Sequence, residues 1–396
     1  MAAARAAELG VQTLLLEKTK RPGTKILMSG GTRCNITHDT DNRGIVEAYG
    51  PPGRFLHSAL AALGVRETID LFEAEGVLTK VEDTGKVFPV SNRAADVLDA
   101  LLRRLSRSGA TSIYEEALID LVAHPDGFRL ITNRGERLAR RVILTVGGQS
   151  YPGSGTTGDG YAITARLGHS IVPPRPALVP LTVDAPWVPE LRGLTLPDVT
   201  LTISEEKKKL ITRRGSLLFA HFGLSGPVAL DVSRVVSGHT SPRRLILEID
   251  LLPDTAESVF EESLRVESAG AGKKQLAVVL STWLPRRLCD DVLSMAGLAV
   301  DRRGAGLSRT ERAALVSAVK RLRLGLTGTL GFGRAEVTAG GISLAEVDSR
   351  DMQSRKIPGL YIAGELLDLD GPIGGYNFQA AWSTGWLAGS KAAARA

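Results

Sequence analysis

Three apolar segments of the chain end in an acid or in glycine, the pattern found at the ligand-binding edge of a parallel sheet. They read VQTLLLE (11–17), RVILTVGG (141–148) and GLYIAGE (359–365). In open α/β sheets, ligands bind at the carboxyl ends of the strands. An acid that closes the second strand of a dinucleotide-binding unit accepts hydrogen bonds from ribose hydroxyls. We predict this role for Glu17, with a plain strand end as the alternative.

The glycine-rich turn that normally accompanies such an acid is absent from this sequence. It is expected about 20 residues before the acid, and only 16 residues precede Glu17. In other dinucleotide-binding proteins, the N–H groups of this turn and the helix that follows it hold a pyrophosphate. We therefore expect the sequence as given to begin inside that helix.

The elements that must position these residues are read from periodicity and from turn residues. We predict helices over 2–9, 54–64, 66–75, 91–108, 161–170 and 377–389. We predict strands over 11–16, 111–121, 127–133, 141–146 and 360–365. The continuous apolar character of 141–146 is typical of a parallel strand that is covered on both faces.

Composition places the chain among folded globular proteins. Of its 396 residues, 43% are hydrophobic and 23% are charged, which excludes a disordered chain and a fibrous repeat. No run reaches the roughly 18 apolar residues of a membrane span, and the first residues lack the apolar centre of a secretory signal. We expect a cytoplasmic protein with no membrane partner.

Cysteine and charge limit the chemistry further. Cys34 and Cys289 are the only cysteines, so the sequence offers no disulfide framework and no CxxC pair for a metal or a dithiol. Any redox chemistry must therefore come from a cofactor, and we expect no metal site. The net charge of +6 favours anionic ligands.

The domain organisation is predicted from a change in composition. The proline-rich segment 173–189 marks a boundary, and β-branched runs over 180–250 then indicate hairpins of a small sheet or barrel. Residues 254–324 have a helical pattern. We predict one α/β domain built from 1–177 and 336–396, interrupted by an insert over 178–335.

Several long motifs together resemble one family. They are MSGGTRCNITH (28–38), TVGGQSYPGSGTTGDGYAI (145–163), LLFAHFGLSGPVAL (217–230) and the segment from 335 to 389. This chain is similar over nearly its whole length to the BaiN/RdsA-type (YhiN-like) NAD(P)/FAD-dependent oxidoreductases of bacteria. The resemblance implies a glutathione-reductase-like FAD-binding domain with a parallel Rossmann-type sheet, an inserted β-barrel-like plus helical domain, and FAD as cofactor.

The sequence departs from the family at its start. Members open with a strand and a GGGAAG-like turn, whereas this chain begins within the helix that follows. Either the start was placed too late, or the protein is truncated at its N-terminus. Loss of the strand would leave two unpaired sheet edges. We expect the 396-residue chain to bind FAD weakly or not at all, and a chain extended upstream to bind it well.

The resemblance implies a set of cofactor-binding residues spread over the whole α/β domain. They are Glu17, Lys18, Gly30, Gly31, Arg33, Cys34, Asn35, Gly147, Gly148, Gly364, Glu365, Gly374, Gly375, Asn377 and Phe378. The helix that starts near Gly374 points its N-terminus at the pyrimidine edge of the flavin in the family. Positive charge there stabilises reduced flavin and raises its electron affinity.

Each of these positions also has a purely structural interpretation. Arg33 is either a partner for phosphate or the flavin edge, or an ordinary surface arginine. Cys34 has no second cysteine nearby, so it packs or lines the flavin rather than forming a redox disulfide. Gly147 and Gly148 either bring the backbone close to the cofactor or only form the turn after a strand. Gly374 and Gly375 either face the flavin or simply cap a helix.

The sequence says less about catalysis. We predict His221 as a proton donor opposite hydride transfer, with a packed core histidine as the alternative. Tyr376 is a second catalytic candidate, and Tyr151 is a weaker one. No second glycine fingerprint follows a strand, so a nicotinamide donor, NAD(P)H, would dock transiently at the flavin.

The predicted function is that of an FAD-dependent oxidoreductase. It transfers hydride through flavin N5 and either reduces an activated C=C of a small organic molecule or oxidises a small substrate. A non-catalytic remnant that has lost FAD binding is one alternative, and an RNA-modifying flavoprotein is another. Basic residues are interleaved with acids and form no aromatic-basic stripe, so we expect no nucleic-acid partner.

Overall fold

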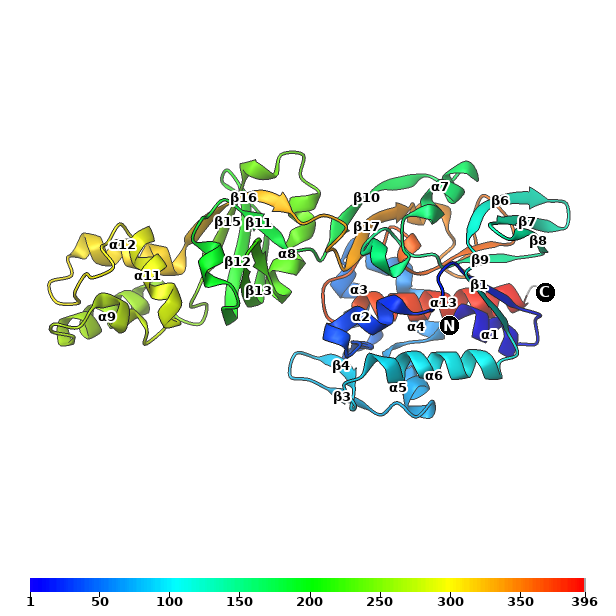
Figure 1. Ribbon diagram of the computed structural model, residues 1–396, viewed down its shortest axis with the longest axis horizontal. Coiled ribbons are helices and arrows are strands. Elements are labelled where there is room, and N and C mark those ends of the chain that lie inside the picture. Colours follow the sequence, from blue (N-terminus) through cyan, green and yellow to red (C-terminus); the bar gives the residue numbers. More distant parts are fainter. Residues whose placement is uncertain (395–396) are drawn as a thin grey trace. The chain divides into compact units, whose positions relative to one another are not determined.

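The computed structural model describes residues 1–394, and the chain forms two compact units (Figure 1). Unit 1 consists of Met1–Pro176 together with the chain from Ala335 onward, and unit 2 is Ala177–Arg334. The two ends of the sequence therefore build one unit. Within residues 1–394, no helix is long and apolar enough to cross a membrane.

Unit 1 contains two pairs of parallel strands. Strand β1 (Leu14–Glu17) pairs with β5 (Thr111–Tyr114), and β9 (Val142–Leu144) pairs with β18 (Leu360–Ile362). These pairs form two separate two-stranded sheets within the described chain. Their apolar runs are the ones predicted to be parallel strands, and the parallel pairing is confirmed.

Unit 1 also contains further small sheets and several helices. One small sheet has the strand order β2-β4-β3, another β6-β7-β8, and β10 pairs with β17. The strands are β2 (Thr37–His38), β3 (Thr79–Val81), β4 (Lys86–Pro89), β6 (Leu118–His124), β7 (Gly127–Thr132), β8 (Gly135–Ala139), β10 (Ile171–Ala177) and β17 (Val337–Ile342).

The helices of unit 1 include the first and the last elements of the chain. The α-helices are α1 (Ala2–Glu8), α2 (Thr24–Thr32), α3 (Asn42–Tyr49), α4 (His57–Ala62), α5 (Val65–Ala74), α6 (Ala94–Arg107), α7 (Asp159–Arg166) and α13 (Tyr376–Ala394). Short 3₁₀ helices are η1 (Pro51–Leu56), η2 (Pro152–Ser154), η5 (Leu344–Glu346) and η6 (Gly364–Leu366). Helix α1 lies beside α13, as Figure 1 shows.

Several predicted boundaries in unit 1 are wrong for local reasons. The strand predicted over 111–121 is two strands, β5 and β6, because the backbone turns at Glu115 with φ +59°. The helix predicted over 161–170 ends at Arg166, and Gly168 follows with φ +88°. Strands β2, β3, β4, β8, β10 and β17 were not predicted, because these short segments do not alternate clearly between apolar and polar residues.

Unit 2 is built around a closed six-stranded barrel with the order β11-β14-β13-β12-β15-β16. Its strands are β11 (Leu181–Val183), β12 (Thr195–Glu205), β13 (Lys208–Ala220), β14 (Gly223–Ser225), β15 (Leu245–Asp250) and β16 (Leu322–Thr329). The barrel and its long β12–β13 hairpin confirm the predicted β-barrel-like insert.

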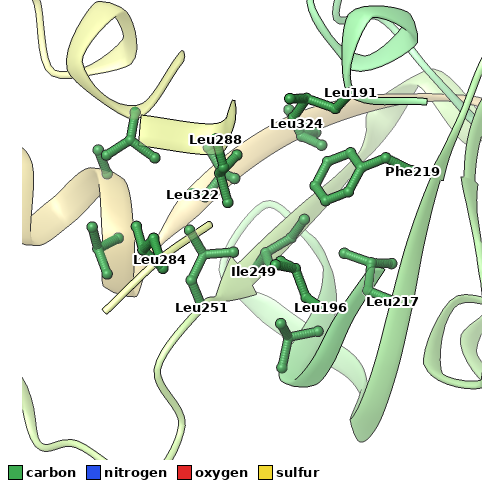
Figure 2. Close-up of a cluster of buried hydrophobic side chains, with 14 of the residues drawn as sticks. Leu191, Leu196, Leu217, Phe219, Ile249, Leu251, Leu284, Leu288, Leu322 and Leu324 are labelled. Carbon is green, nitrogen blue, oxygen red and sulfur yellow. The ribbon is translucent and has the colours of Figure 1, made fainter. Parts of the chain in front are cut away.

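Most helices of unit 2 lie in the sequence between β15 and β16. They are α9 (Glu257–Gly270), α10 (Leu276–Leu280), α11 (Arg286–Met295) and α12 (Arg309–Lys320), with η3 (Val188–Leu191) and η4 (Pro242–Arg244) at the barrel. Figure 2 shows barrel residues such as Phe219 and Ile249 in one buried cluster with Leu284 and Leu288. A single apolar core therefore joins the barrel to the helices.

One element contradicts the hairpins predicted over 180–250. Residues Pro227–Ser237 form helix α8 although they are rich in valine. Pro227 occupies the first helical turn, where its missing N–H costs nothing. Val228, Val232 and Val236 recur at four-residue spacing and are buried. This spacing buries one helix face, and burial outweighs the β preference of the individual residues.

Candidate functional site

The loop at residues 29–34 interrupts helix α2 with left-handed backbone. Gly30, Gly31 and Thr32 have φ of +55°, +66° and +68°, and Cys34 has φ +61°. A Cβ at Gly30 would lie 2.8 Å from the Phe88 ring, so this position requires glycine for space as well as for conformation. Three successive left-handed residues are rare, and such backbone concentrates at ligand sites.

The side chains of Arg33, Cys34 and Asn35, at the end of this loop and just after it, have different surroundings. The Arg33 guanidinium lies 3.9 Å over the Phe88 ring and pairs with Glu82. Cys34 is fully buried, and burial raises the pKa of its thiol to about 11, so it is not a thiolate near neutral pH. Asn35 is also buried, and its Oδ1 has no hydrogen-bond partner within the described residues.

The start of helix α13 is held against strand β2. Gly375 has φ +98°, and a Cβ there would lie 2.4 Å from the carbonyl of Thr37. The His38 ring stacks on Tyr376 with centroids 4.6 Å apart, and its Nδ1 lies 3.1 Å from the Gly374 carbonyl oxygen. These contacts bring strand β2, which follows the glycine loop, and the predicted flavin-facing helix N-terminus together.

Asn377 and Phe378 are the next two residues of α13 predicted to bind the cofactor, and their side chains contact other residues of the protein. The Asn377 amide accepts from the N–H of Gly371 at 2.8 Å and donates to its carbonyl at 3.0 Å. Phe378 stacks on Trp382 at 5.2 Å beside a buried cluster. These side chains therefore shape the loop and the helix.

Glu365 is the centre of a second cluster, formed by segments remote in sequence. Its carboxylate accepts from Lys25 Nζ at 2.6 Å and from the Thr338 N–H at 2.7 Å. The Thr338 hydroxyl oxygen in turn accepts from the N–H groups of Gln149 and Ser150, at 2.8 and 3.0 Å. Glu365 thus connects α2, β17 and the loop after β9.

The Glu365 cluster also contains a buried phenol. Tyr161 is 7% exposed, and its hydroxyl has no hydrogen-bond partner among the described residues. Burial first and then the negative charge of Glu365 raise the pKa of Tyr161 far above its usual value. A Cβ at Gly148 would lie 2.4 Å from the Thr338 hydroxyl and 3.1 Å from the Tyr161 hydroxyl, so Gly148 leaves a narrow space there. Gly364, the residue before the acid, has φ +71° and donates its N–H to Thr384.

The end of β1 lies against the glycine-rich loop after β9. One Glu17 oxygen accepts from the N–H and the hydroxyl of Thr19, each at 2.8 Å. Lys18 Nζ pairs with Asp159 and donates to Thr157 at 2.7 Å. Gly147 has φ +73° at the start of the loop. The second Glu17 oxygen makes no hydrogen bond within residues 1–394, so it can accept one from a ligand.

The predicted catalytic residues lie in different units. Tyr376 is half-buried beside His38 in unit 1, and Tyr151 precedes η2 in the loop after β9 with φ +57°. His221 lies in unit 2 at the turn between β13 and β14, where it is exposed and meets the Phe222 ring edge-on. The alternative interpretation of His221 as a packed core histidine is therefore wrong.

Sequence reasoning missed four residues of these clusters. They are Lys25, His38, Tyr161 and Thr338. Lys25 and His38 lie close to the glycine loop in the sequence, so this proximity could have identified them. Thr338 gave no such signal, because its hydrogen-bond partners Ser150 and Gln149 lie 188 and 189 residues earlier in the sequence.

The geometry of unit 1 fits a dinucleotide cofactor. Strand β1 ends at Glu17 and strand β9 leads into Gly147, a side chain would clash at Gly30, Gly148 and Gly375, and Asn35 and Tyr161 present buried polar atoms without partners among the described residues. An unpaired buried polar group costs free energy unless a ligand or water satisfies it. The fold and these residues define a Rossmann-type flavin-dependent oxidoreductase.

Comparison with known proteins names the family. The model of the HI0933-like protein Rossmann domain matches residues 1–391, and the chain belongs to this family. Over 383 residues, it is 34% identical to the ribosomal RNA dihydrouridine synthase of Escherichia coli, covering 97% of this chain and 92% of that protein.

Two further relatives are similar over the same extent. The 3-dehydro-bile acid delta(4,6)-reductase of Clostridium scindens is 31% identical over 387 residues, covering 97% of this chain and 93% of that protein. The ribosomal RNA dihydrouridine synthase of Haemophilus influenzae is 31% identical over 390 residues, with the same two shares covered. The predicted family and enzyme class are confirmed.

Proposed function

We propose that this protein uses FAD to reduce a carbon–carbon double bond conjugated to a carbonyl group, with NAD(P)H as hydride donor. The names of the relatives support this chemistry. Dihydrouridine arises by reduction of the ring double bond of uridine, and the bile acid reductase acts on double bonds conjugated to a 3-keto group. In both substrates the carbonyl makes the far carbon of the double bond accept hydride.

The observation that carries the proposal is the Lys25–Glu365 pair in the cluster that joins both ends of the chain. Together with the 29–34 loop and the α13 N-terminus, this cluster would hold FAD. FAD, when bound, supplies hydride from N5. The partial positive charge at the start of α13 favours a negatively charged ligand edge. Asn35 Oδ1 would accept a hydrogen bond from the cofactor, which removes the cost of its burial.

The remaining chemistry is the delivery of a proton to the second carbon of the bond. We assign this to His221, an exposed imidazole in unit 2. Tyr376, whose ring is held in place by stacking on His38, is the candidate on unit 1. A proton donor must lie within hydrogen-bond reach of the carbon that it protonates, so solvent isotope effects on variants of these residues distinguish the two.

An RNA substrate is the second candidate, and the distribution of charge favours it. Unit 2 contains 22 Lys and Arg against 17 Asp and Glu, whereas the rest of the chain contains 27 against 26. Lys207, Lys208 and Lys209 are exposed at the tip of the β12–β13 hairpin and have no acidic partner within the described residues. Phosphate backbones bind such cations in a salt-dependent way.

Anaerobic reoxidation of the reduced flavin tests the function. The chain is titrated with FAD, reduced with NADPH or NADH, and mixed with a 4-ene-3-keto steroid or with a uridine-containing RNA. We expect one acceptor to restore the visible absorbance of oxidised flavin. Flavin that binds but is reoxidised by neither acceptor would contradict the proposal, and failure to bind FAD both by this chain and by one extended upstream would support the remnant alternative.

A further inference from the structure

Arg175, on strand β10, is a half-buried arginine without a partner in the described part of the chain. Its Nε atom is buried and makes no hydrogen bond there, and its guanidinium forms no ion pair within residues 1–394. The other arginines of unit 1 whose described side chains make no hydrogen bond or ion pair are all exposed; they are Arg21, Arg54, Arg134 and Arg140. Removal of a charge from water is costly unless acceptor groups compensate for it. Arg175 therefore lacks an acceptor that a ligand could supply.

Strand β10 runs antiparallel to β17, which carries Thr338. At one end of the pair, the Ser343 N–H bonds the Ser170 carbonyl. Further along the pair, a Cβ at Gly340 would lie 2.5 Å from the Pro173 carbonyl oxygen. Residue numbers thus rise along one strand as they fall along the other, and the same register places position 175 of β10 opposite Thr338.

This register places the Arg175 side chain on the face of the sheet that the glycine-rich loop after β9 covers. Directly opposite residues point their side chains to the same face, with Cβ atoms roughly 5 Å apart. On that face, the Thr338 hydroxyl accepts from the N–H groups of Gln149 and Ser150. The Thr338 N–H donates to Glu365 instead of across the strands, as it does in a pair that is not hydrogen-bonded. The guanidinium of Arg175 therefore leaves the sheet beside the Glu365 cluster.

We propose that Arg175 binds the carbonyl oxygen of the substrate and stabilises the negative charge that this oxygen acquires during reduction. The inference rests on the proposed function, which supplies the hydride from NAD(P)H. Hydride added to the far carbon of the conjugated double bond shifts the π electron pair toward the carbonyl, and the oxygen becomes an enolate. A proton delivered to the carbon next to the carbonyl then restores the C=O bond. Arg175 keeps its protons throughout and only donates hydrogen bonds.

A guanidinium is suited to this role. It presents a planar fork of N–H donors and stays charged, so it stabilises an oxyanion without transferring a proton. Donors aimed at developing charge act most strongly where water is excluded, and the buried Nε of Arg175 meets this condition. His221 and Tyr376 remain the candidates for the proton itself. The assignment therefore gives oxygen stabilisation and proton delivery to different side chains.

A phenolate resembles the enolate oxygen and tests this contact without turnover. 4-Nitrophenol is coloured when it is ionised, so its absorbance reports the pKa of the bound phenol. The full chain, with FAD added, is titrated with 4-nitrophenol at a series of pH values. In the wild type, we expect the pKa of the bound phenol to lie about one unit or more below that of the free phenol, because a nearby opposite charge favours the ionised form.

The variant Arg175→Met removes the charge and keeps an apolar side chain of similar length. Equilibrium dialysis should show that nitrophenolate binds at least ~10-fold more weakly to it, whereas neutral 4-nitroanisole binds within ~2-fold of the wild type. Arg175→Lys keeps the charge and should restore part of the pKa shift. We also expect Arg175→Met to slow reoxidation of the reduced flavin by about 10²-fold, as for loss of one donor to an oxyanion.

Arg134→Met is the matched control, because it removes an exposed arginine on the turn between β7 and β8. It should bind nitrophenolate as the wild type does. A 3-keto steroid and uracil both have the conjugated carbonyl, so a 4-ene-3-keto steroid and uridine are tested as competitors, and the one that displaces nitrophenolate identifies the source. Displacement by neither, no binding to the wild type, no pKa shift in the wild type, or equal binding to Arg175→Met would each overturn the proposal. Circular dichroism spectra confirm that the variants fold.

The two proposals fail in different ways. If nitrophenolate binding depends on Arg175 but neither acceptor reoxidises the reduced flavin, the oxygen-binding site stands and the proposed reaction fails. If an acceptor reoxidises the flavin equally fast in the wild type and in Arg175→Met, the reaction stands and the role of Arg175 fails.

Discussion

Among the described residues, the apolar core of unit 1 is divided into three clusters, whereas that of unit 2 is one continuous cluster. In unit 1, buried polar side chains connect segments far apart in sequence: the Gln379 amide bonds Thr37, Leu63 and Thr68, and Glu365 bonds Lys25 and Thr338. In unit 2, one continuous apolar cluster fills the barrel and extends into the helices. Polar networks specify a single geometry because each member must be satisfied, which suits a cofactor holder, whereas an apolar core suits a rigid scaffold for a surface cavity.

Truncation of the barrel core should have the largest effect. Phe219 is fully buried at the centre of the cluster. We expect Phe219→Ala to lower the stability of unit 2 by about 3–5 kcal/mol through lost burial and the cavity left behind. Urea unfolding followed by circular dichroism measures this. Val259→Ala, at a side chain that is 57% exposed, is the control and should change stability by less than ~0.5 kcal/mol.

Substitution of Gly375 should destabilise unit 1 through a steric clash and backbone strain. Gly375→Ala places a Cβ 2.4 Å from the Thr37 backbone in addition to straining a positive φ. We expect a loss of about 3 kcal/mol together with reduced flavin binding. Gly50→Ala has similar strain but open space around it, so it should cost about 1 kcal/mol. Equal losses in thermal unfolding would show that the contact with β2 is unimportant.

Removal of one charge from the Glu365 cluster should act on cofactor affinity more than on folding. We expect Glu365→Gln to weaken FAD binding about tenfold, because a hydrogen bond to a charged group contributes ~1.5–3 kcal/mol. Lys25→Met should have a similar effect, and the double variant should lose less than the sum. Fluorescence titration with FAD measures each. Glu47→Gln, in an exposed ion pair, should leave affinity unchanged.

Acid should weaken unit 1 through His169. When neutral, this buried ring donates from Nδ1 to Glu346 at 3.1 Å and accepts at Nε2 from the Ser354 hydroxyl at 2.9 Å. Burial, opposed by Glu346, lowers the pKa of His169. The pKa of Glu346 is also lowered, to about 2, because hydrogen bonds from Lys356 and Ser170 outweigh the opposing effect of burial.

The sign of this pH dependence follows from the direction of the histidine shift. Below about pH 6.5 the unfolded chain takes up a proton before the folded one does, so stability falls as pH falls. We expect a slope below ~1.4 kcal/mol per pH unit, the limit for one linked proton. Urea unfolding between pH 7 and 5 should show this slope reduced in His169→Gln and retained in His57→Gln, at an exposed histidine. An unchanged slope in the first variant would assign the effect to another group.

The smallest effect should come from Arg33. Its guanidinium is partly exposed and already engaged by Glu82 and by the Phe88 ring. Exposed ion pairs contribute roughly 0–1 kcal/mol. We expect Arg33→Ala to lower stability by less than ~1 kcal/mol and to change FAD affinity no more than threefold. A larger loss of FAD affinity would indicate that Arg33 binds the cofactor phosphate.

The sequence was sufficient for features that depend on neighbouring residues. Apolar runs ending in an acid or glycine predicted the parallel strands, and long glycine-containing motifs identified the family and the fold. Prediction from sequence failed where tertiary packing outweighed a local preference. Valine content favoured strands at Pro227–Ser237, but burial of one helix face decided the element.

The tertiary structure alone decided which of these residues meet. Lys25 and Glu365 are 340 residues apart, and His38 and Gly374 are 336 apart, so no periodicity relates them. A surface cavity of unit 2 that Asp184 and His221 help to line likewise depends on how strands β11, β13 and β14 close into the barrel. Sequence determines backbone preferences over a few residues, whereas contacts between distant segments depend on topology and on the burial that the whole fold achieves.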